Sequence, residues 1–154
     1  MTNNDVLRRL RYILNVDDNK MAAIYHLTGE KVSENQMQHW LQKDEDPGFA
    51  EMPDEELAVF LNGLIIEKRG RKDGPQPVPE KELTNNILLK KLKIAFQLKD
   101  FDMLEILKLA DQEISKHELS AFFRKPGHKN YRICNDQIFR KFLTGLQMKI
   151  SPSG

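Results

Sequence analysis

The chain has 154 residues and carries 24 lysine and arginine residues against 23 aspartate and glutamate residues, so its formal net charge is only +1. Together with 40% hydrophobic residues, this balance excludes a disordered polyelectrolyte and a uniformly basic protein that coats nucleic acid. Cys134 is the only cysteine, which excludes an intrachain disulfide and favours a reducing compartment, the cytoplasm. No apolar run approaches the roughly 20 residues that cross a membrane, so we expect no membrane association.

The sequence repeats itself at an offset of 82 residues. Residues 4–43 align with 86–125, and 54–64 align with 136–146, while the loop between these segments differs. The identical residues fall on positions that would bury or cap helices: Asn4/Asn86, Leu7/Leu89, Leu10/Leu92, Asp18/Asp100, Met21/Met103, Ile24/Ile106, Leu27/Leu109, Ser33/Ser115, Lys43/Lys125 and Asp54/Asp136. We therefore predict two structurally equivalent units.

The first copy predicts four helices. The first, near 4–15, places its apolar residues on one face, and the second repeats apolar residues with a period of 3.6. Ser33 and Gln36 have the spacing of a capping box, which predicts the start of the third helix. The fourth helix is predicted to begin at Asp54 and to end at Gly70.

Residues 69–82 contain two glycines and three prolines, which cannot continue a helix and predict an extended linker. The expected units are therefore 1–68 and 83–150. The second unit repeats the helical pattern, with a first helix near 86–98 and a capping box at Ser115. No alternating pattern with a hairpin turn occurs, so the predicted class is all-α, with two tandem four-helix units.

Two pairs of equivalent residues predict how the helices pack. Gly63 and Gly145 lie in the middle of the fourth helices, where each costs about 1 kcal/mol relative to alanine. Close packing of helices, within each unit or between the units, would offset that cost. Trp40 and Phe122 are predicted to be buried at equivalent positions of the third helices.

The two copies differ most in charge, in and around the loop before the fourth helix. Residues 42–58 contain seven acidic residues and one lysine, whereas 124–141 contain six basic residues and one aspartate. We predict that the basic segment binds an anionic partner, a protein segment or a nucleic acid. The candidate binding residues are Arg124, Lys125, His128, Lys129, Tyr131, Arg132, Arg140 and Lys141.

Other interpretations of this contrast remain open. Both charged faces could simply be solvated, they could attract each other within one molecule, or they could join molecules into a homo-oligomer. The second and third helices also suggest a helix-turn-helix regulator that binds nucleic acid, with Ser33 at the start of the reading helix. Its exposed residues would be Asn35, Gln36, Gln38, His39 and Gln42.

Catalysis is the third hypothesis. The four histidines lack metal-ligand spacing, and no glycine-rich phosphate loop or serine nucleophile motif is present. Cys134 aligns with Met52, which favours a small apolar filler over a reactive thiol. We therefore expect a non-enzymatic binding or regulatory module, with no cofactor and no bound metal.

Two segments, NNDVLRRLRYIL at 3–14 and RKPGHKNYRICNDQIFRKFLTGL at 124–146, resemble the YehS-like family of small bacterial proteins. The Lys-Pro-Gly-His-Lys-Asn-Tyr-Arg stretch of that family corresponds to residues 125–132, and the resemblance covers essentially the whole chain. It implies a cytoplasmic bacterial protein built from a tandem duplication of a domain of unknown function. It carries over no catalytic or binding residue.

Overall fold

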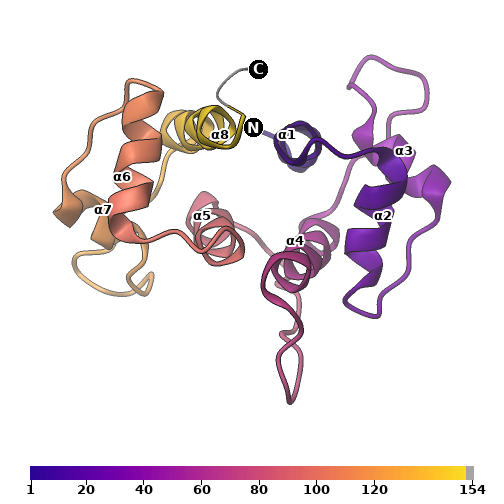
Figure 1. Cartoon of the computed structure of the whole chain (residues 1–154), viewed down its shortest axis with the longest axis horizontal. Helices are drawn as coiled ribbons and strands as arrows, with labels where there is room; N and C mark the ends of the chain where they lie inside the picture. Colours follow the sequence, from indigo (N-terminus) through magenta and orange to yellow (C-terminus); the bar gives the residue numbers. More distant parts are fainter. Residues whose placement is uncertain (152–154) are drawn as a thin grey trace. The chain divides into compact units, whose positions relative to one another are not determined.

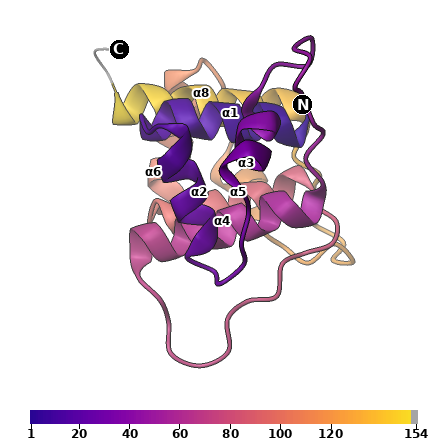
Figure 2. The same ribbon diagram turned by 90° about the vertical axis from the view of Figure 1, so that its right-hand side faces the viewer.

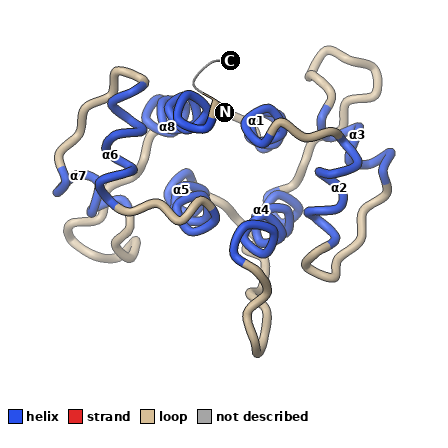
Figure 3. Tube along the Cα trace, viewed as in Figure 1, coloured by secondary structure: helices blue, strands red, loops and turns tan. Residues whose placement is uncertain are grey.

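The computed structural model describes residues 1–151, which form eight α-helices and no strand (Figures 1 and 3). The chain divides into two compact units, Met1–Leu83 and a second unit that starts at Thr84. Each unit contains four helices in the same order, which confirms the predicted all-α class. No helix of the described part is both long and apolar enough to cross a membrane.

The first unit consists of α1 (Asn3–Leu14), α2 (Asp18–His26), α3 (Glu34–Leu41) and α4 (Asp54–Arg69). The short helices α2 and α3 lie across the longer α1 and α4 (Figure 2), and α2 packs against both α3 and α4. Side-chain caps define the starts of the first three helices, because Thr2, Asp17 and Ser33 each accept a backbone N–H of the first turn. Gly70 ends α4 with a positive φ of 82°.

The second unit consists of α5 (Asn85–Ala95), α6 (Asp100–Leu109), α7 (Lys116–Phe122) and α8 (Asp136–Ile150). Its packing repeats that of the first unit, with α6 against α7 and α8, and α5 against α8. Helix α5 ends three residues before the predicted boundary because the chain turns into the left-handed region at Gln97, where φ is 54°. Asn15 makes the equivalent turn after α1, with φ of 55°.

Two of the predicted caps differ in one detail. Ser115 and Glu118 form the full capping box, because the serine accepts the Glu118 N–H and the Glu118 carboxylate accepts the Ser115 N–H. Ser33 accepts the Gln36 N–H at 3.0 Å, but the return bond from the Ser33 N–H to the Gln36 side chain is not made. A neutral amide is a weaker acceptor than a carboxylate, which accounts for the difference.

The cores of the two units are built from equivalent positions. Trp40 and Phe122 are both 5% exposed, which confirms that the third helices are anchored by equivalent buried rings. Around them lie fully buried residues of the other helices, among them Leu7, Leu10, Met21, Ile24 and Phe60 in the first unit and Leu89, Leu92, Met103, Ile106 and Phe142 in the second.

The two mid-helix glycines lie where helices approach each other most closely. A Cβ atom on Gly63 would clash with the backbone carbonyl oxygen of Ile24, and one on Gly145 would clash with that of Ile106. The glycines therefore allow α4 to contact α2 and α8 to contact α6, within each unit. This contact is with backbone, so a side chain at either position could not be accommodated by a change of rotamer.

Candidate partner-binding site

The loop between α7 and α8 carries most of the predicted binding residues, and buried hydrogen bonds fix its position. The Asn86 side chain, only 6% exposed, donates to the carbonyl oxygens of Phe122 at 3.0 Å and Arg132 at 2.8 Å. Its oxygen accepts the Cys134 N–H at 2.9 Å. One asparagine thus holds the end of α7 and the end of the loop against the start of α5.

A second asparagine extends this anchor to the start of α8. Asn85 donates to the Cys134 carbonyl at 3.0 Å and to the Asp136 carboxylate at 2.7 Å. The bond from Asn85 also holds the pKa of Asp136 below its ordinary value. Asn3 and Asn4 make the same bonds in the first unit, to Met52, Asp54, Trp40 and Ala50, so the fold itself sets the position of both loops.

Backbone turns give the loop a defined shape. The His128 N–H donates to the Lys125 carbonyl at 2.9 Å, and the Tyr131 N–H donates to the His128 carbonyl at 3.0 Å. The His128 ring accepts the Asn130 N–H through Nδ1 at 3.0 Å. Because these turns are formed without a partner, binding would order little additional backbone.

A cleft of about 310 Å³ opens in the second unit, between the start of α5, the end of α7 and the loop. Its lining is mostly apolar and includes three basic side chains. The lining residues are Thr84, Asn86, Ile87, Lys90, Phe122, Phe123, Arg124, Lys125, Pro126 and Tyr131. In the part of the chain that the structure describes, no carboxylate forms an ion pair with Lys90, Arg124 or Lys125. The cleft therefore presents uncompensated positive charge beside aromatic surface.

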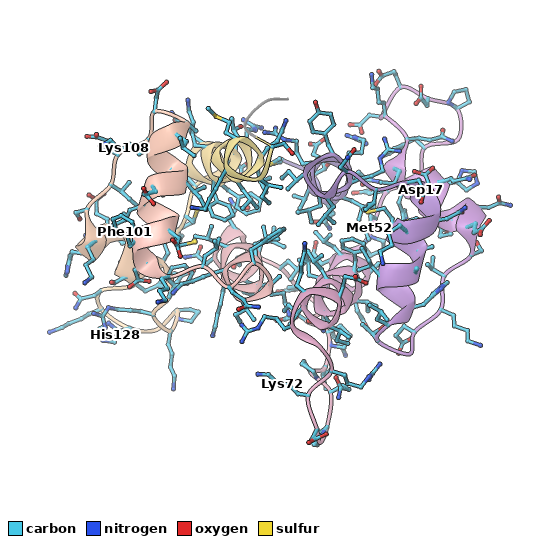
Figure 4. All side chains as sticks on the ribbon, viewed as in Figure 1. Asp17, Met52, Lys72, Phe101, Lys108 and His128 are labelled. Carbon is cyan, nitrogen blue, oxygen red and sulfur yellow. The ribbon has the colours of Figure 1, made fainter. Side chains whose placement is uncertain are left out.

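The structure brings together three of the eight predicted residues, Arg124, Lys125 and Tyr131. The remaining five do not line the cleft: His128, Lys129, Arg132, Arg140 and Lys141. His128 lies on the outer part of the loop (Figure 4), where its ring supports the turn. Arg140 and Lys141 lie on α8, beyond the loop.

Sequence reasoning missed Lys90, Ile87 and Phe123 as part of the cleft lining. A lysine on an amphipathic helix ordinarily faces water, so Lys90 alone does not indicate a site. Aligning the two copies could have found it, since the equivalent residue is Arg8.

Arg8 occupies the position of Lys90 in the first unit, and carboxylates of that unit neutralise its charge. Its guanidinium donates to the Gln42 carbonyl at 2.6 Å and to the Asp5 carboxylate at 2.5 Å, and Asp44 lies 3.7 Å away. Partial burial disfavours the ionised form of Asp5 and by itself would raise its pKa. Hydrogen bonds from Thr2 and the charge of Arg8 outweigh this effect, so the pKa of Asp5 is lowered.

The second unit lacks both of these carboxylates. Ile87 occupies the position equivalent to Asp5, and Pro126 follows Lys125 where Asp44 follows Lys43. The change leaves the cation of the second unit facing an open apolar cleft.

Two of the acidic residues of the first unit, Glu51 and Glu56, line a different cleft of about 530 Å³ together with Trp40. The Tyr25 hydroxyl donates to Glu56 at 2.6 Å, and burial together with this bond raises the pKa of Tyr25. Ile133 and Ile138 replace the two glutamates in the second unit. The charge contrast predicted between the copies is therefore built into specific positions of each unit.

The one thiol of the chain lies in the core of the second unit. Cys134 is fully buried, and its burial, aided by the nearby charge of Asp136, raises the pKa of the thiol to about 12. This burial confirms the interpretation of Cys134 as a small apolar filler. No group of three or more His, Cys, Asp or Glu side chains in this part of the chain could hold a metal ion.

The helix-turn-helix hypothesis predicts a short turn between the second and third helices of each unit. Helix α2 ends at His26 and α3 begins at Glu34, so the connection spans residues 27–33. This is longer than the usual turn of three or four residues. The His26 ring bonds to the Val32 backbone at 2.8 Å and fixes this wider connection.

A family model described as "Protein of unknown function (DUF1456)" matches the chain twice, at residues 3–70 and 85–150. The chain belongs to this family, and each helical unit contains one match. It is also 46% identical to "Uncharacterized protein YehS" of Escherichia coli (strain K12) over 147 residues, 95% of this chain and 94% of that protein. The predicted YehS-like resemblance is thus confirmed, and no solved structure matches the chain.

Proposed function

We propose that the protein is a non-enzymatic binding module whose second unit holds an acidic segment of a partner protein in the cleft beside Lys90. The observation that supports this most directly is the difference between the two units. Arg8 is bound by two carboxylates of its own unit, whereas Lys90 lies at the equivalent position with none. A carboxylate supplied by a partner would restore in the second unit the pairing that the first unit makes internally.

The lining of the cleft favours a protein segment over a bare anion. Phe122, Phe123 and Tyr131 offer aromatic surface, so an apolar side chain next to the acidic residue could be buried there. Arg124 can hold a carboxylate through two parallel hydrogen bonds, which Lys90 cannot. The Thr84 hydroxyl in the lining already accepts the Ile87 N–H at 3.2 Å as a helix cap.

We place this module in the bacterial cytoplasm. Two observations support that location: the single thiol is buried, as suits a reducing compartment, and the chain is related to an Escherichia coli protein. The acidic segment is then expected on another cytoplasmic protein.

The experiment measures binding of a fluorescent peptide of alternating glutamate and phenylalanine by anisotropy. The cleft variant carries Lys90→Glu with Arg124→Glu. The matched control carries Lys129→Glu with Arg132→Glu, the same change of charge on exposed residues that do not line the cleft. We expect the cleft variant to bind roughly tenfold or more weakly and the control to change by less than about threefold.

Equal losses in the two variants would show that the peptide responds only to overall charge and would overturn the proposal. A parallel titration with duplex DNA tests the helix-turn-helix alternative. Binding of DNA whose affinity falls steeply with salt, and exceeds that of the peptide, would favour that alternative.

A further inference from the structure

The chain carries its own candidate for the acidic segment. Asp44, Glu45 and Asp46 are consecutive and exposed in the loop between α3 and α4 of the first unit. This loop is the counterpart of the basic loop in the duplicated fold, and the Asn4 side chain holds its end in place. Every molecule therefore presents one acidic loop and one basic cleft, in equal number.

The acidic loop is ordered without a partner. The Lys43 N–H donates to the Asp46 carboxylate at 3.1 Å, and the Asp46 N–H donates to the Lys43 carbonyl at 3.0 Å. The Phe49 N–H donates to the Asp46 carbonyl at 3.1 Å. Both surfaces are thus preformed, which lowers the entropic cost of bringing them together.

In the first unit, a carboxylate of the acidic loop already forms an ion pair with a basic side chain. Asp44 already approaches Arg8, at the position equivalent to Lys90. Glu45 makes no ion pair with any residue of the described part of the chain. The formal net charge of +1 means that two whole molecules repel each other only weakly.

We infer that the acidic loop of one molecule, centred on Asp44 and Glu45, docks at the Lys90 and Arg124 cleft of a second copy of the chain. This inference rests on the proposed function, since it names the occupant of the same cleft. A two-fold dimer makes the contact twice, because each molecule gives its loop and receives its partner's; a heterologous arrangement makes it once per link. Either arrangement is weakened by salt, because the loop and the cleft rim are exposed.

The test is a charge exchange followed by sedimentation velocity. The cleft variant carries Lys90→Glu with Arg124→Glu, and the loop variant carries Asp44→Lys with Glu45→Lys. In either variant alone, loop and cleft have the same sign and repel. In a mixture of the two, both contacts regain opposite signs.

We expect the wild-type protein to associate as its concentration rises at low ionic strength, with its weight-average mass roughly doubling for a two-fold dimer. Each variant alone should remain monomeric, and an equimolar mixture should associate as the wild type does. Circular dichroism and unfolding midpoints check that both variants fold. A synthetic peptide of residues 43–51 should dissociate the wild-type assembly, which provides a readout that needs no variant.

A wild-type protein that stays monomeric under these conditions, or a mixture that does not associate, would overturn the inference. The peptide of glutamate and phenylalanine separates this result from failure of the proposed function. If the loop variant binds that peptide while the wild type does not self-associate, the cleft is a binding site for another protein. If the loop variant does not bind that peptide and the wild type does not self-associate, both proposals fail.

Discussion

Arg8 and Lys90 occupy equivalent positions on the first helices of two copies of one fold, yet their surroundings differ completely. Two carboxylates contact the arginine, whereas the lysine borders an open cleft lined by aromatic side chains. Two equivalent asparagines, Asn4 and Asn86, hold the backbone at the end of the third helix and in the following loop of each unit. The comparison shows which residues build the fold and which residues are free to give each copy its own surface.

The residues common to both copies serve the backbone. Asn4 and Asn86 satisfy two carbonyls and one N–H each, and Gly63 and Gly145 allow helices to touch through their main chains. Buried polar groups without partners and clashes with backbone are costly wherever the fold is used, so these positions cannot vary independently of it. A surface charge carries no such cost, which explains why the two loops can differ in sign.

The largest expected effect tests whether the two units depend equally on their third helices. Trp40→Ala and Phe122→Ala should each lower the free energy of unfolding of their own unit by about 3–5 kcal/mol, because a buried ring is lost and a cavity remains. Urea unfolding followed by circular dichroism measures both. A loss below about 1 kcal/mol in one unit would show that its ring is not a structural anchor.

The next effect concerns the buried asparagines. Asn86→Ala removes three hydrogen bonds and should cost about 2–4 kcal/mol, because two carbonyls and one N–H lose their partner. Asn4→Ala should cost a similar amount in the first unit. Only Asn86→Ala should also weaken binding of the acidic peptide, since it frees the loop that lines the cleft.

Urea unfolding and peptide anisotropy together separate these effects. Peptide binding that is unchanged in a destabilised but folded Asn86→Ala protein would show that the loop keeps its position without the asparagine. Equal weakening by Asn4→Ala would place the binding surface in both units.

Much of this architecture follows from the sequence, and the reasons differ by residue. Ser33 and Ser115 are local signals, because a cap acts on the nearest backbone, so their roles could be predicted. The mid-helix glycines predicted close packing, but not that the backbone they contact is that of Ile24 and Ile106. Asn86 acts on carbonyls 36 and 46 residues away, so its repeat in both copies marked the position without revealing the bond partners. Charge counting pointed to the loop between α7 and α8, part of which lines the cleft.

The cleft was less predictable because it joins side chains from separate parts of the chain. Lys90 belongs to α5 and Tyr131 to the loop after α7, and no spacing rule brings them together. Counting charges also included Arg140 and Lys141, which are near in sequence but lie on α8, outside the cleft lining.

A smaller effect should follow from giving the second unit the carboxylate of the first. Ile87→Asp places an acidic group where Asp5 contacts Arg8, so Lys90 should be neutralised from within. We expect the acidic peptide to bind about tenfold more weakly, a change of about 1.4 kcal/mol. Ile133→Asp is the matched control, because Ile133 is 76% exposed on the loop between α7 and α8 and does not line the cleft. Anisotropy showing the same loss for both variants would contradict the equivalence of Ile87 and Asp5.

The smallest expected effect is a dependence of the free energy of unfolding on pH, which arises from the Asp5–Arg8 pair of the first unit. The pKa of Asp5 is lowered in the folded protein, so its carboxylate stabilises the fold above the unfolded value of about 3.9. That contribution is lost as pH falls through the lower, folded pKa. Because the side chains of Asp5 and Arg8 are 38% and 21% exposed, the effect should stay below about 1 kcal/mol.

Asp5→Asn removes this titration. Comparing its urea midpoint with that of the wild type near neutral pH and well below the unfolded pKa should show a difference at neutral pH that shrinks in acid. Ile87→Asn provides the control in the second unit, where the residue replaced has no charge to titrate; its difference from the wild type should not change with pH. A difference for Asp5→Asn that is equally constant would mean that the Asp5–Arg8 pair adds nothing to stability. The first unit would then keep its carboxylates only to neutralise the cation that the second unit leaves exposed.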